Sequence, residues 1–452
     1  MKSYIPFYKS NLKVAIPVML SQMGQVVVQM ADTMMVGQLG ADELAAVSFA
    51  NAIFNIGLLF AMGTALGLTP LVGEAFARKE QKTLKSLFQN AYALNIILFA
   101  VVGLLLWITS FFMTNMGQTP RVAELAVPYF RVMVLSMLPL MIFLVFKQFL
   151  EGMGNTKTAM NITIGTNVLN IFLNWVFIYG NLGAPALGVQ GAATATLISR
   201  IVMPIIFVGI FIKRAELRSY LQLLKGRGYS VDSIISIAKV GLPIGTQIFV
   251  EQIAFSLTAV MVGWLGAVAL ASHQVAMNIS FFCFMILSGL GAGTTVRVSH
   301  QYGLGAFRPM RKAAFASFHL TIFTVMIAAT IIVLFRHQIP TLFSSDADVI
   351  ATSASLLLIC ALYQLPDGFQ VVTLGALRGI SDVKRPMIYA VISYLFINIP
   401  VGYYCGFVLN MGPVGIWIGF IFGLTTASLL FLYRFNAQSK RHVEKESIEV
   451  KA

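Results

Sequence analysis

The chain has 452 residues, of which 58% are hydrophobic and 11% are charged, and its formal net charge is +14. This composition excludes a soluble protein, because a soluble domain must cover its surface with polar groups. The basic residues form short clusters between apolar runs, which is typical of membrane loops and argues against a nucleic-acid-binding protein. We therefore expect a protein that crosses a lipid bilayer many times.

Twelve apolar runs are long enough to cross a bilayer, since a spanning helix needs roughly 20 mostly apolar residues. The first run continues to Gly40, so it is too long for a signal-peptide core and is expected to remain as a span. The runs cover residues 12–38, 46–72, 89–114, 125–150, 157–181, 188–213, 238–265, 268–300, 314–336, 349–378, 385–409 and 414–435.

Lys and Arg residues concentrate in the loops that follow even-numbered runs, whereas loops after odd-numbered runs hold little more than Arg121 and Arg336. Because positively charged loops stay in the cytoplasm, both termini are expected to face the cytoplasm of a bacterial inner membrane. The longest polar interruption lies near the middle. The predicted division is an N-lobe (1–213), a cytoplasmic linker (214–237), a C-lobe (238–436) and a cytoplasmic tail (437–452).

The two halves of the chain are related by an internal repeat. The matched residues are 35–41 with 261–267, Pro17 with Pro243 and Gly67 with Gly293 at a shift of 226, and Pro139 with Pro366 and Gly152 with Gly379 at a shift of 227. Each half has an even number of spans, so the halves start on the same side of the membrane and form a parallel repeat. An all-α protein with two six-helix lobes around a central cavity is the layout of alternating-access transporters.

Three carboxyl residues lie well inside the apolar runs: Asp32, Glu251 and Asp367. An ionisable group at the bilayer centre costs about 2.5–3.5 kcal/mol, so a functional role is expected. The structural alternative is that each acid pairs with a buried base, for which Lys147 and Arg200 are the main candidates.

The chemistry expected of these acids is exchange of one cation for another. A carboxyl group in an apolar cavity can take up and release a proton, and two carboxylates with nearby oxygen atoms can hold Na⁺. Either state also attracts a cationic drug. If the coupling ion and the drug disfavour each other's binding, antiport follows from reciprocal linkage.

Several uncharged polar residues also lie inside the runs. Asn167, Asn170 and Asn174 share one face of the fifth helix, where they either contact an ion or substrate or hold neighbouring helices together. Gln274 and Asn278 are one turn apart in the eighth run, where cavity lining and bonding between helices are both open.

Two further predictions concern an apolar pocket and a gate. Phe255, one turn after Glu251, is either part of an adaptable substrate pocket or core filler. Glu151 and Arg378 occupy repeat-equivalent positions with opposite charge at the cytoplasmic ends of two runs. They are expected to help close the cytoplasmic side, with independent, solvated ends as the alternative.

The motifs and their order resemble the multidrug and toxic compound extrusion (MATE) family, in its NorM-like branch, over about residues 10–435. The segments that carry the resemblance are Pro17, Asp32–Gly37, Glu251 followed by Gly263–Gly266, Gln364–Asp367 and Leu377–Gly379. The resemblance implies two six-helix lobes around a V-shaped cavity. It also implies multidrug efflux, and hence antibiotic resistance, by export of cationic and often aromatic compounds in exchange for Na⁺ or H⁺.

The resemblance also implies which residues carry the coupling ion. In the N-lobe these are Asp32, Asn170, Asn174 and Thr196, and in the C-lobe they are Glu251, Asp367 and Tyr363. The C-lobe pair is associated with Na⁺ coupling, so Na⁺ at Glu251 and Asp367 is expected. Asn174 stands where some relatives have a second acid, which weakens a proton relay confined to the N-lobe. We expect a monomer with no cofactor beyond the coupling ion.

Two other functions were weighed. A lipid-linked oligosaccharide flippase shares the architecture, but its cavity would need several basic residues for pyrophosphate, and these are scarce in the runs. An intramembrane enzyme could use Glu251 and Asp367 for general acid–base chemistry. The chain lacks GxGD, HExxH and GxSxG motifs, so an enzyme is not expected.

Overall fold

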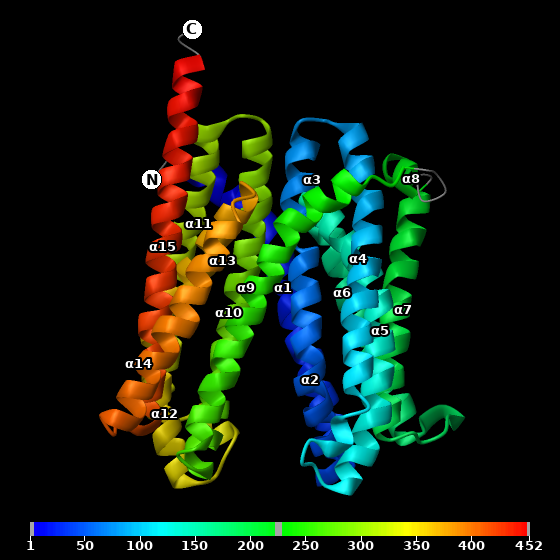
Figure 1. The fold of residues 1–452 in the computed structure, drawn as a ribbon, viewed down its shortest axis with the longest axis vertical. Helices are drawn as coiled ribbons and strands as arrows, with labels where there is room; N and C mark the ends of the chain where they lie inside the picture. The colour runs from blue at the N-terminus through cyan, green and yellow to red at the C-terminus, as the bar shows by residue number, and fades with distance from the viewer. Residues whose placement is uncertain (1–3, 222–227, 450–452) are drawn as a thin grey trace. The chain divides into compact units, whose positions relative to one another are not determined.

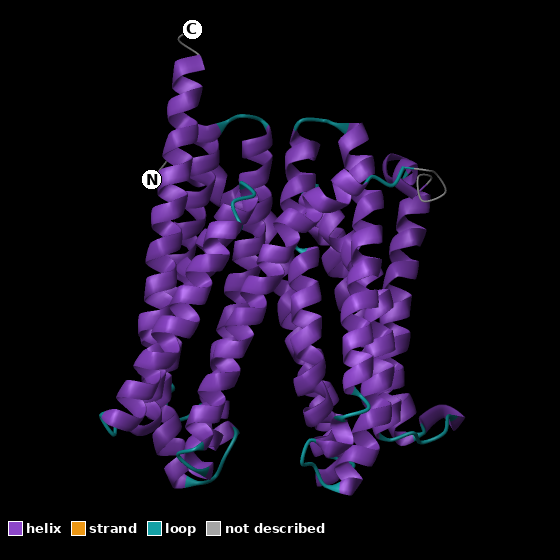
Figure 2. Cartoon of the chain, in the orientation of Figure 1, coloured by secondary structure: helices purple, strands orange, loops and turns teal. Residues whose placement is uncertain are grey.

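The computed structural model describes residues 4–221 and 228–449, which are drawn as a ribbon in Figure 1. These parts are helices joined by loops, without a strand among the described residues (Figure 2). Twelve of their helical segments are long and apolar enough to cross a membrane, which confirms the predicted spans. Residues 222–227 of the predicted linker and 450–452 of the predicted tail lie outside the described residues.

The helices follow one another without any other regular structure between them in the described chain. They are α1 (Ile5–Gly37), α2 (Ala41–Ala65), α3 (Leu68–Ala77), α4 (Gln81–Thr109), η2 (Met113–Asn115), α5 (Pro120–Gly152), α6 (Thr156–Tyr179), η3 (Asn181–Gly183), α7 (Val189–Lys213), α8 (Ala215–Leu221), α9 (Val231–Gly263), α10 (Ala267–Gly303), α11 (Phe307–Leu334), η5 (Pro340–Leu342), α12 (Ala347–Gly379), α13 (Lys384–Val391), η6 (Ile392–Asn398), α14 (Ile399–Tyr403), η7 (Tyr404–Val408) and α15 (Gly412–Glu449).

Many helices are longer than the apolar runs that predicted them. The second span is built from α2 and α3, and the eleventh runs from α13 through the π-helical segments η6 and η7. The helix α15 continues through the described part of the predicted tail, and α8 lies inside the predicted linker. Polar ends of a helix add nothing to an apolar run, so counting apolar residues underestimates helix length.

Local sequence signals explain where several helices begin and end. The hydroxyl of Thr119 accepts a hydrogen bond from the Val122 N–H (3.4 Å), and Pro120 occupies the first turn of α5. The carboxylate of Asp346 accepts from the N–H of Asp348 (2.8 Å) at the start of α12. Gly180 ends α6 at a φ of 75°, a left-handed conformation that glycine adopts without strain.

The chain forms two compact units. The N-unit is Ser21–Gly245, and the C-unit combines Met1–Leu20 with Thr246–Ala452. This division differs from the predicted lobes because α1 and α9 each contribute one segment to each unit. Each change comes shortly after a proline inside the helix, Pro17 in α1 and Pro243 in α9. Proline removes a backbone hydrogen bond and crowds the preceding turn, so it lets a helix bend at that point.

The internal repeat is present in three dimensions as matching contacts within each unit. A Cβ atom added at Gly67 in the N-unit would lie 2.5 Å from the Cα of Gly241. A Cβ atom added at Gly293 in the C-unit would lie 2.9 Å from the Cα of Ala15. The four residues are related by the same shift of 226. The first segments of α1 and α9 therefore pack in equivalent ways, each against the second span of the opposite half.

A second pair of glycines repeats in the same manner. A Cβ at Gly152 would lie 2.8 Å from the Cβ of Val72, and one at Gly379 would lie 2.7 Å from the Cβ of Val298. Small residues at such positions let transmembrane helices approach closely, which is how helices associate where no water drives them together. Each unit also has its own apolar core, with Phe88 fully buried in the N-unit.

Candidate functional site

The N-unit places Asp32 of α1 against the polar face of α6. The half-buried carboxylate of Asp32 accepts a hydrogen bond from the Nδ2 of Asn174, which also contacts the Oδ1 of Asn170 at 3.3 Å. Spacing of four residues on α6 brings these two amides to one face, as the sequence predicted. Asn167 is buried on α6 as well, and its Nδ2 has no hydrogen-bond partner among the described residues.

The N-unit also holds a base near Asp32. Arg200 of α7 interacts electrostatically with Asp32, but no direct ion pair joins them in the described chain. Its guanidinium instead donates to the hydroxyl of Ser136 (2.7 Å) and lies 5.6 Å from the ring centroid of Phe54. Thr196 is half-buried one turn before Arg200 on the same helix. Asp32 is thus balanced by Arg200 without being bound to it.

The C-unit surrounds Glu251 of α9 with hydrogen-bond donors. Its carboxylate accepts from the Nε2 atoms of Gln247 (2.9 Å) and Gln370 (3.0 Å), and it also interacts with the hydroxyl of Tyr394. The guanidinium of Arg378 donates to the Oε1 of Gln247 (3.3 Å) and interacts electrostatically with Glu251. A positive group and several donors therefore stabilise the negative charge of Glu251.

Asp367 of α12 has very different surroundings. Its side chain is 6% exposed and interacts electrostatically with Glu251, yet no hydrogen bond or ion pair to it is found within the described residues. Tyr363, one turn earlier, donates its hydroxyl proton to Ser280 (2.6 Å) instead. Gln364, also one turn away, has a buried Oε1 without a partner. An acid and an amide oxygen thus lie on neighbouring turns of α12, and neither has a hydrogen-bond donor among the described residues.

The residues predicted to line a substrate cavity fall into two groups. Phe255 is half-buried in the C-unit, where its ring lies 5.1 Å from that of Phe420 and 6.5 Å from that of Tyr394. Gln274 and Asn278 are exposed on α10. Contact of these residues with a substrate stays a prediction.

The predicted cytoplasmic gate pairs residues that each have a partner in their own unit. Glu151 is 5% exposed and lies 3.9 Å from the ammonium group of Lys147. Arg378 belongs to the Glu251 network of the C-unit. Glu151 is therefore buried and not solvated, whereas the role of the two residues in closing the cytoplasmic side stays a prediction.

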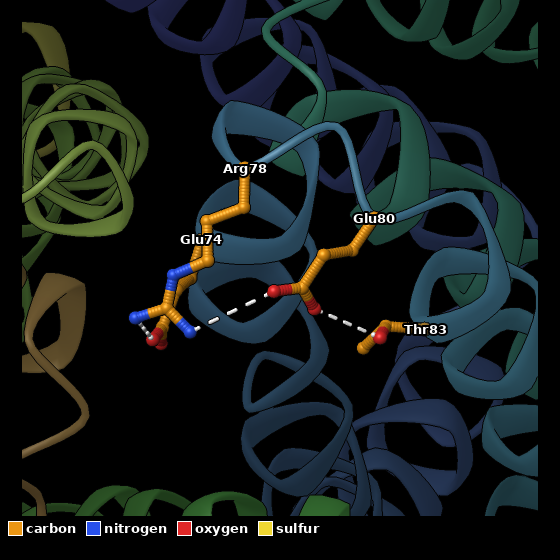
Figure 3. A network of polar contacts seen from close by, with 4 residues as sticks. All are labelled: Glu74, Arg78, Glu80 and Thr83. Carbon is orange, nitrogen blue, oxygen red and sulfur yellow. Dashed lines mark hydrogen bonds and ion pairs between the residues drawn. The ribbon is translucent and has the colours of Figure 1, made fainter.

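A surface acid offers a contrast with the buried ones. Glu74 of α3 pairs with Arg78 at 2.7 Å, and Arg78 also lies 3.9 Å from Glu80, which accepts from Thr83 (Figure 3). These side chains are partly exposed at the end of the helix. Solvent screens the charges of such a network. Glu74 therefore differs from Asp367, which is buried and has no hydrogen bond or ion pair among the described residues.

Three partners of the buried acids were not predicted from the sequence: Gln247, Gln370 and Tyr394. Gln247 lies one turn before Glu251, and Gln370 lies one turn after Asp367, so helical spacing could have indicated both. Tyr394 lies in the π-helical segment η6, whose register no periodic pattern reveals.

The described residues contain no group of three or more His, Cys, Asp and Glu side chains that could hold a metal ion. Two carboxylates and an amide oxygen are hard ligands, which suit Na⁺ rather than a transition metal.

A family model described as MatE matches residues 17–176 and 243–404. The two matched segments start at the repeated prolines and fall in the two repeat halves. This chain belongs to the MatE family. The family consists of membrane transporters, so the chain is a multi-pass membrane transporter and not an enzyme, as the resemblance implied.

Relatives extend over nearly the whole chain. The probable multidrug resistance protein NorM of Rhizobium meliloti is 31% identical over 442 residues, which cover 96% of this chain and 94% of that protein. The NorM protein of Mannheimia succiniciproducens is 32% identical, with 97% and 95% covered. The multidrug resistance protein MdtK of Yersinia pestis is 31% identical, with 98% of each chain covered.

Solved structures show the same fold. The eukaryotic MATE transporter AtDTX14 has a TM-score of 0.87 at 19% identity, with 98% of this chain and 99% of that chain covered. An outward-facing MATE transporter has a TM-score of 0.86 at 23% identity, with 97% of each chain covered. The two-repeat, twelve-helix architecture of this MatE chain is thereby confirmed.

Proposed function

We propose that this chain is a multidrug efflux antiporter that exports organic cations, often aromatic, in exchange for Na⁺, with H⁺ as the alternative coupling ion. The NorM and MdtK relatives, named as multidrug resistance proteins, support the efflux role. The observation that carries the antiport role is Asp367. A carboxyl group buried without a donor needs a cation or a proton to meet its charge.

The charges of the two units support a coupling site in the C-unit. In the N-unit, Asp32 is matched by Arg200. In the C-unit, Arg378 interacts with Glu251, and Glu251 in turn with Asp367, so among these three groups of the described chain the two acids carry one negative charge in excess. A monovalent cation would neutralise that excess.

Three oxygen-bearing side chains are suited to hold the ion. Asp367 and Glu251 provide carboxylate oxygens, and Gln364 provides an amide oxygen that has no hydrogen-bond partner in the part of the chain that the structure describes. Na⁺ prefers such hard ligands. A cationic drug and Na⁺ that both need the same negative charge disfavour each other's binding, and this reciprocal coupling drives exchange.

The direction of export rests on the orientation proposed from the loops, with both termini in the cytoplasm of a bacterial inner membrane. The flippase alternative gains no support from the buried bases. The guanidinium groups of Arg200 and Arg378 are already engaged, by Ser136 and Gln247.

The test is dye efflux from proteoliposomes with Na⁺ and pH gradients imposed separately. Asp367→Asn removes the excess charge, so ion-driven efflux should fall at least about tenfold, the effect of 1.4 kcal/mol. Glu251→Gln should also reduce it. The surface variant Glu74→Gln, which leaves the buried acids intact, serves as the matched control. Unchanged efflux in both buried-acid variants, with normal insertion, would remove the coupling role.

A further inference from the structure

The N-unit has a groove between α6 and α7 at the end where its basic loops gather. Its volume is about 270 Å³. One part of its wall is apolar and the other is polar, and the two parts follow the helix axes in order. None of its residues belongs to the polar clusters around Asp32, Glu251 or Asp367.

The apolar part of the groove lies next to the polar part, further from the ends of the two helices. It is lined by Ile162 and Gly165 of α6 and by Ile206 and Ile210 of α7. A Cβ atom added at Gly165 would meet no heavy atom within 4 Å, so the groove is open at this point. Exposed apolar side chains such as Ile205 continue the apolar surface along α7. Hydrocarbon is the natural occupant of such a surface in a bilayer.

The polar part lies at the helix ends. Thr158 and Asn161 come from the first turns of α6, and Arg214 follows directly after the last residue of α7. Arg214 is exposed and ends α7 in an extended conformation. The N-terminal turns of a helix carry a partial positive charge, which adds to that of the guanidinium. Lys157 and Lys213 are exposed at the same end.

We propose that this groove binds an anionic phospholipid, with its phosphate at Arg214, Thr158 and Asn161 and part of one acyl chain against Ile162, Gly165, Ile206 and Ile210. The order of polar and apolar walls matches that of a phospholipid, from headgroup to chain. Charge selects an anionic headgroup, because each basic residue near a membrane surface attracts anionic lipid with about 1 kcal/mol, or about fivefold. The site is independent of the coupling ion.

The test uses the full chain in phosphatidylcholine vesicles that contain a small fraction of phosphatidylglycerol with a photoactivatable acyl chain. Labelled peptides are then identified by mass spectrometry. In the unaltered chain, label should concentrate on α6 and α7. Arg214→Gln should reduce it about fivefold, and Gly165→Leu, which adds a side chain where an added Cβ atom meets open space, should reduce it severalfold.

Matched controls separate the groove from the rest of the surface. Gly209 of α7 also has open space for a side chain but does not line the groove, so Gly209→Leu should leave the labelling unchanged. Lys82→Gln removes an exposed basic residue elsewhere in the N-unit and should also leave it unchanged. Arg214 is exposed, so its variant tests the site even where Gly165→Leu disturbs folding.

Two results would overturn the proposal. Photoactivatable phosphatidylcholine that labels α6 and α7 as strongly as phosphatidylglycerol would mean an ordinary boundary lipid. Labelling by a photoactivatable fatty acid that phosphatidylglycerol cannot displace would assign the groove to a different ligand. Since the readout is lipid labelling and not efflux, its failure leaves the proposed antiport untouched.

Discussion

Glu251 and Asp367 interact with each other, yet the structure gives them opposite surroundings. Glu251 receives two amide donors and faces Arg378, whereas no donor reaches Asp367 within the described chain. The difference suggests a division of work in the proposed cycle. We propose that the protein itself meets the charge of Glu251, and that the moving cation meets the charge of Asp367.

Arg378 should then set how tightly the coupling ion is held. Arg378→Met removes the positive charge that interacts with Glu251 in the described chain, so we expect the Na⁺ concentration for half-maximal dye efflux to fall about tenfold, with slower maximal efflux because release is harder. That shift corresponds to about 1.4 kcal/mol, modest for a buried charge. The measurement is efflux rate against Na⁺ concentration in proteoliposomes.

Arg378→Lys provides the matched control for charge, because it keeps the positive group while losing the fixed geometry toward Gln247. Its half-maximal Na⁺ concentration should stay close to that of the unaltered chain. If Arg378→Met leaves this concentration unchanged while the protein remains folded, Arg378 does not tune the site.

At the scale of single residues, the sequence was informative where burial is expensive. A functional role could be predicted for Asp32, Glu251 and Asp367, because burying an ionisable group in the hydrocarbon core of a bilayer costs free energy. Gln247 and Gln370 were missed although helical spacing places each one turn from a buried acid, since amides inside membrane helices usually serve only to hold helices together. Arg378 was predicted to belong to a gate because its repeat-equivalent residue, Glu151, has the opposite charge. The sequence does not show that Arg378 lies near Glu251.

At the scale of helices, the repeated glycines mark where backbones touch. Gly67 and Gly293 sit at equivalent close approaches, to Gly241 in the N-unit and to Ala15 in the C-unit. Sequence comparison of the halves found the glycines but not what they pack against. A shifted alignment relates positions within one chain, and it carries no information on which helix segment is the neighbour.

We expect Gly67→Ala and Gly293→Ala to destabilise the protein by similar amounts, because each added methyl group would overlap backbone or Cα atoms. Overpacking of this kind typically costs about 1–3 kcal/mol. Thermal unfolding in detergent measures the effect, with Gly209→Ala, where space is open, as the matched control. Equal melting of all three variants would contradict the inferred close contacts.

At the scale of the whole molecule, each unit is completed by a segment from the other half of the chain. In the C-unit, Asn11 of α1 is buried and donates hydrogen bonds to the carbonyl of Ala313 (2.8 Å) and the hydroxyl of Ser317 (2.9 Å). In the N-unit, the start of α9 places Ser233 3.0 Å from Ser86. From the sequence we predicted two separate lobes, because apolar runs and a central linker reveal only the order of the helices along the chain. They do not reveal that a helix segment from one half packs into the unit formed by the other half.

This exchange makes a prediction about the two halves as separate chains. A cut in the linker between α8 and α9 leaves each half without the segment that completes its unit, so neither half should fold alone. The two halves expressed together should restore dye efflux, since each supplies the missing segment of the other. Cooperative thermal unfolding and elution as a single species measure folding of each half. If the N-terminal half alone unfolds cooperatively at the temperature of the intact protein, then the first segment of α9 contributes little to the N-unit, and the exchange of segments is not needed for that unit to fold.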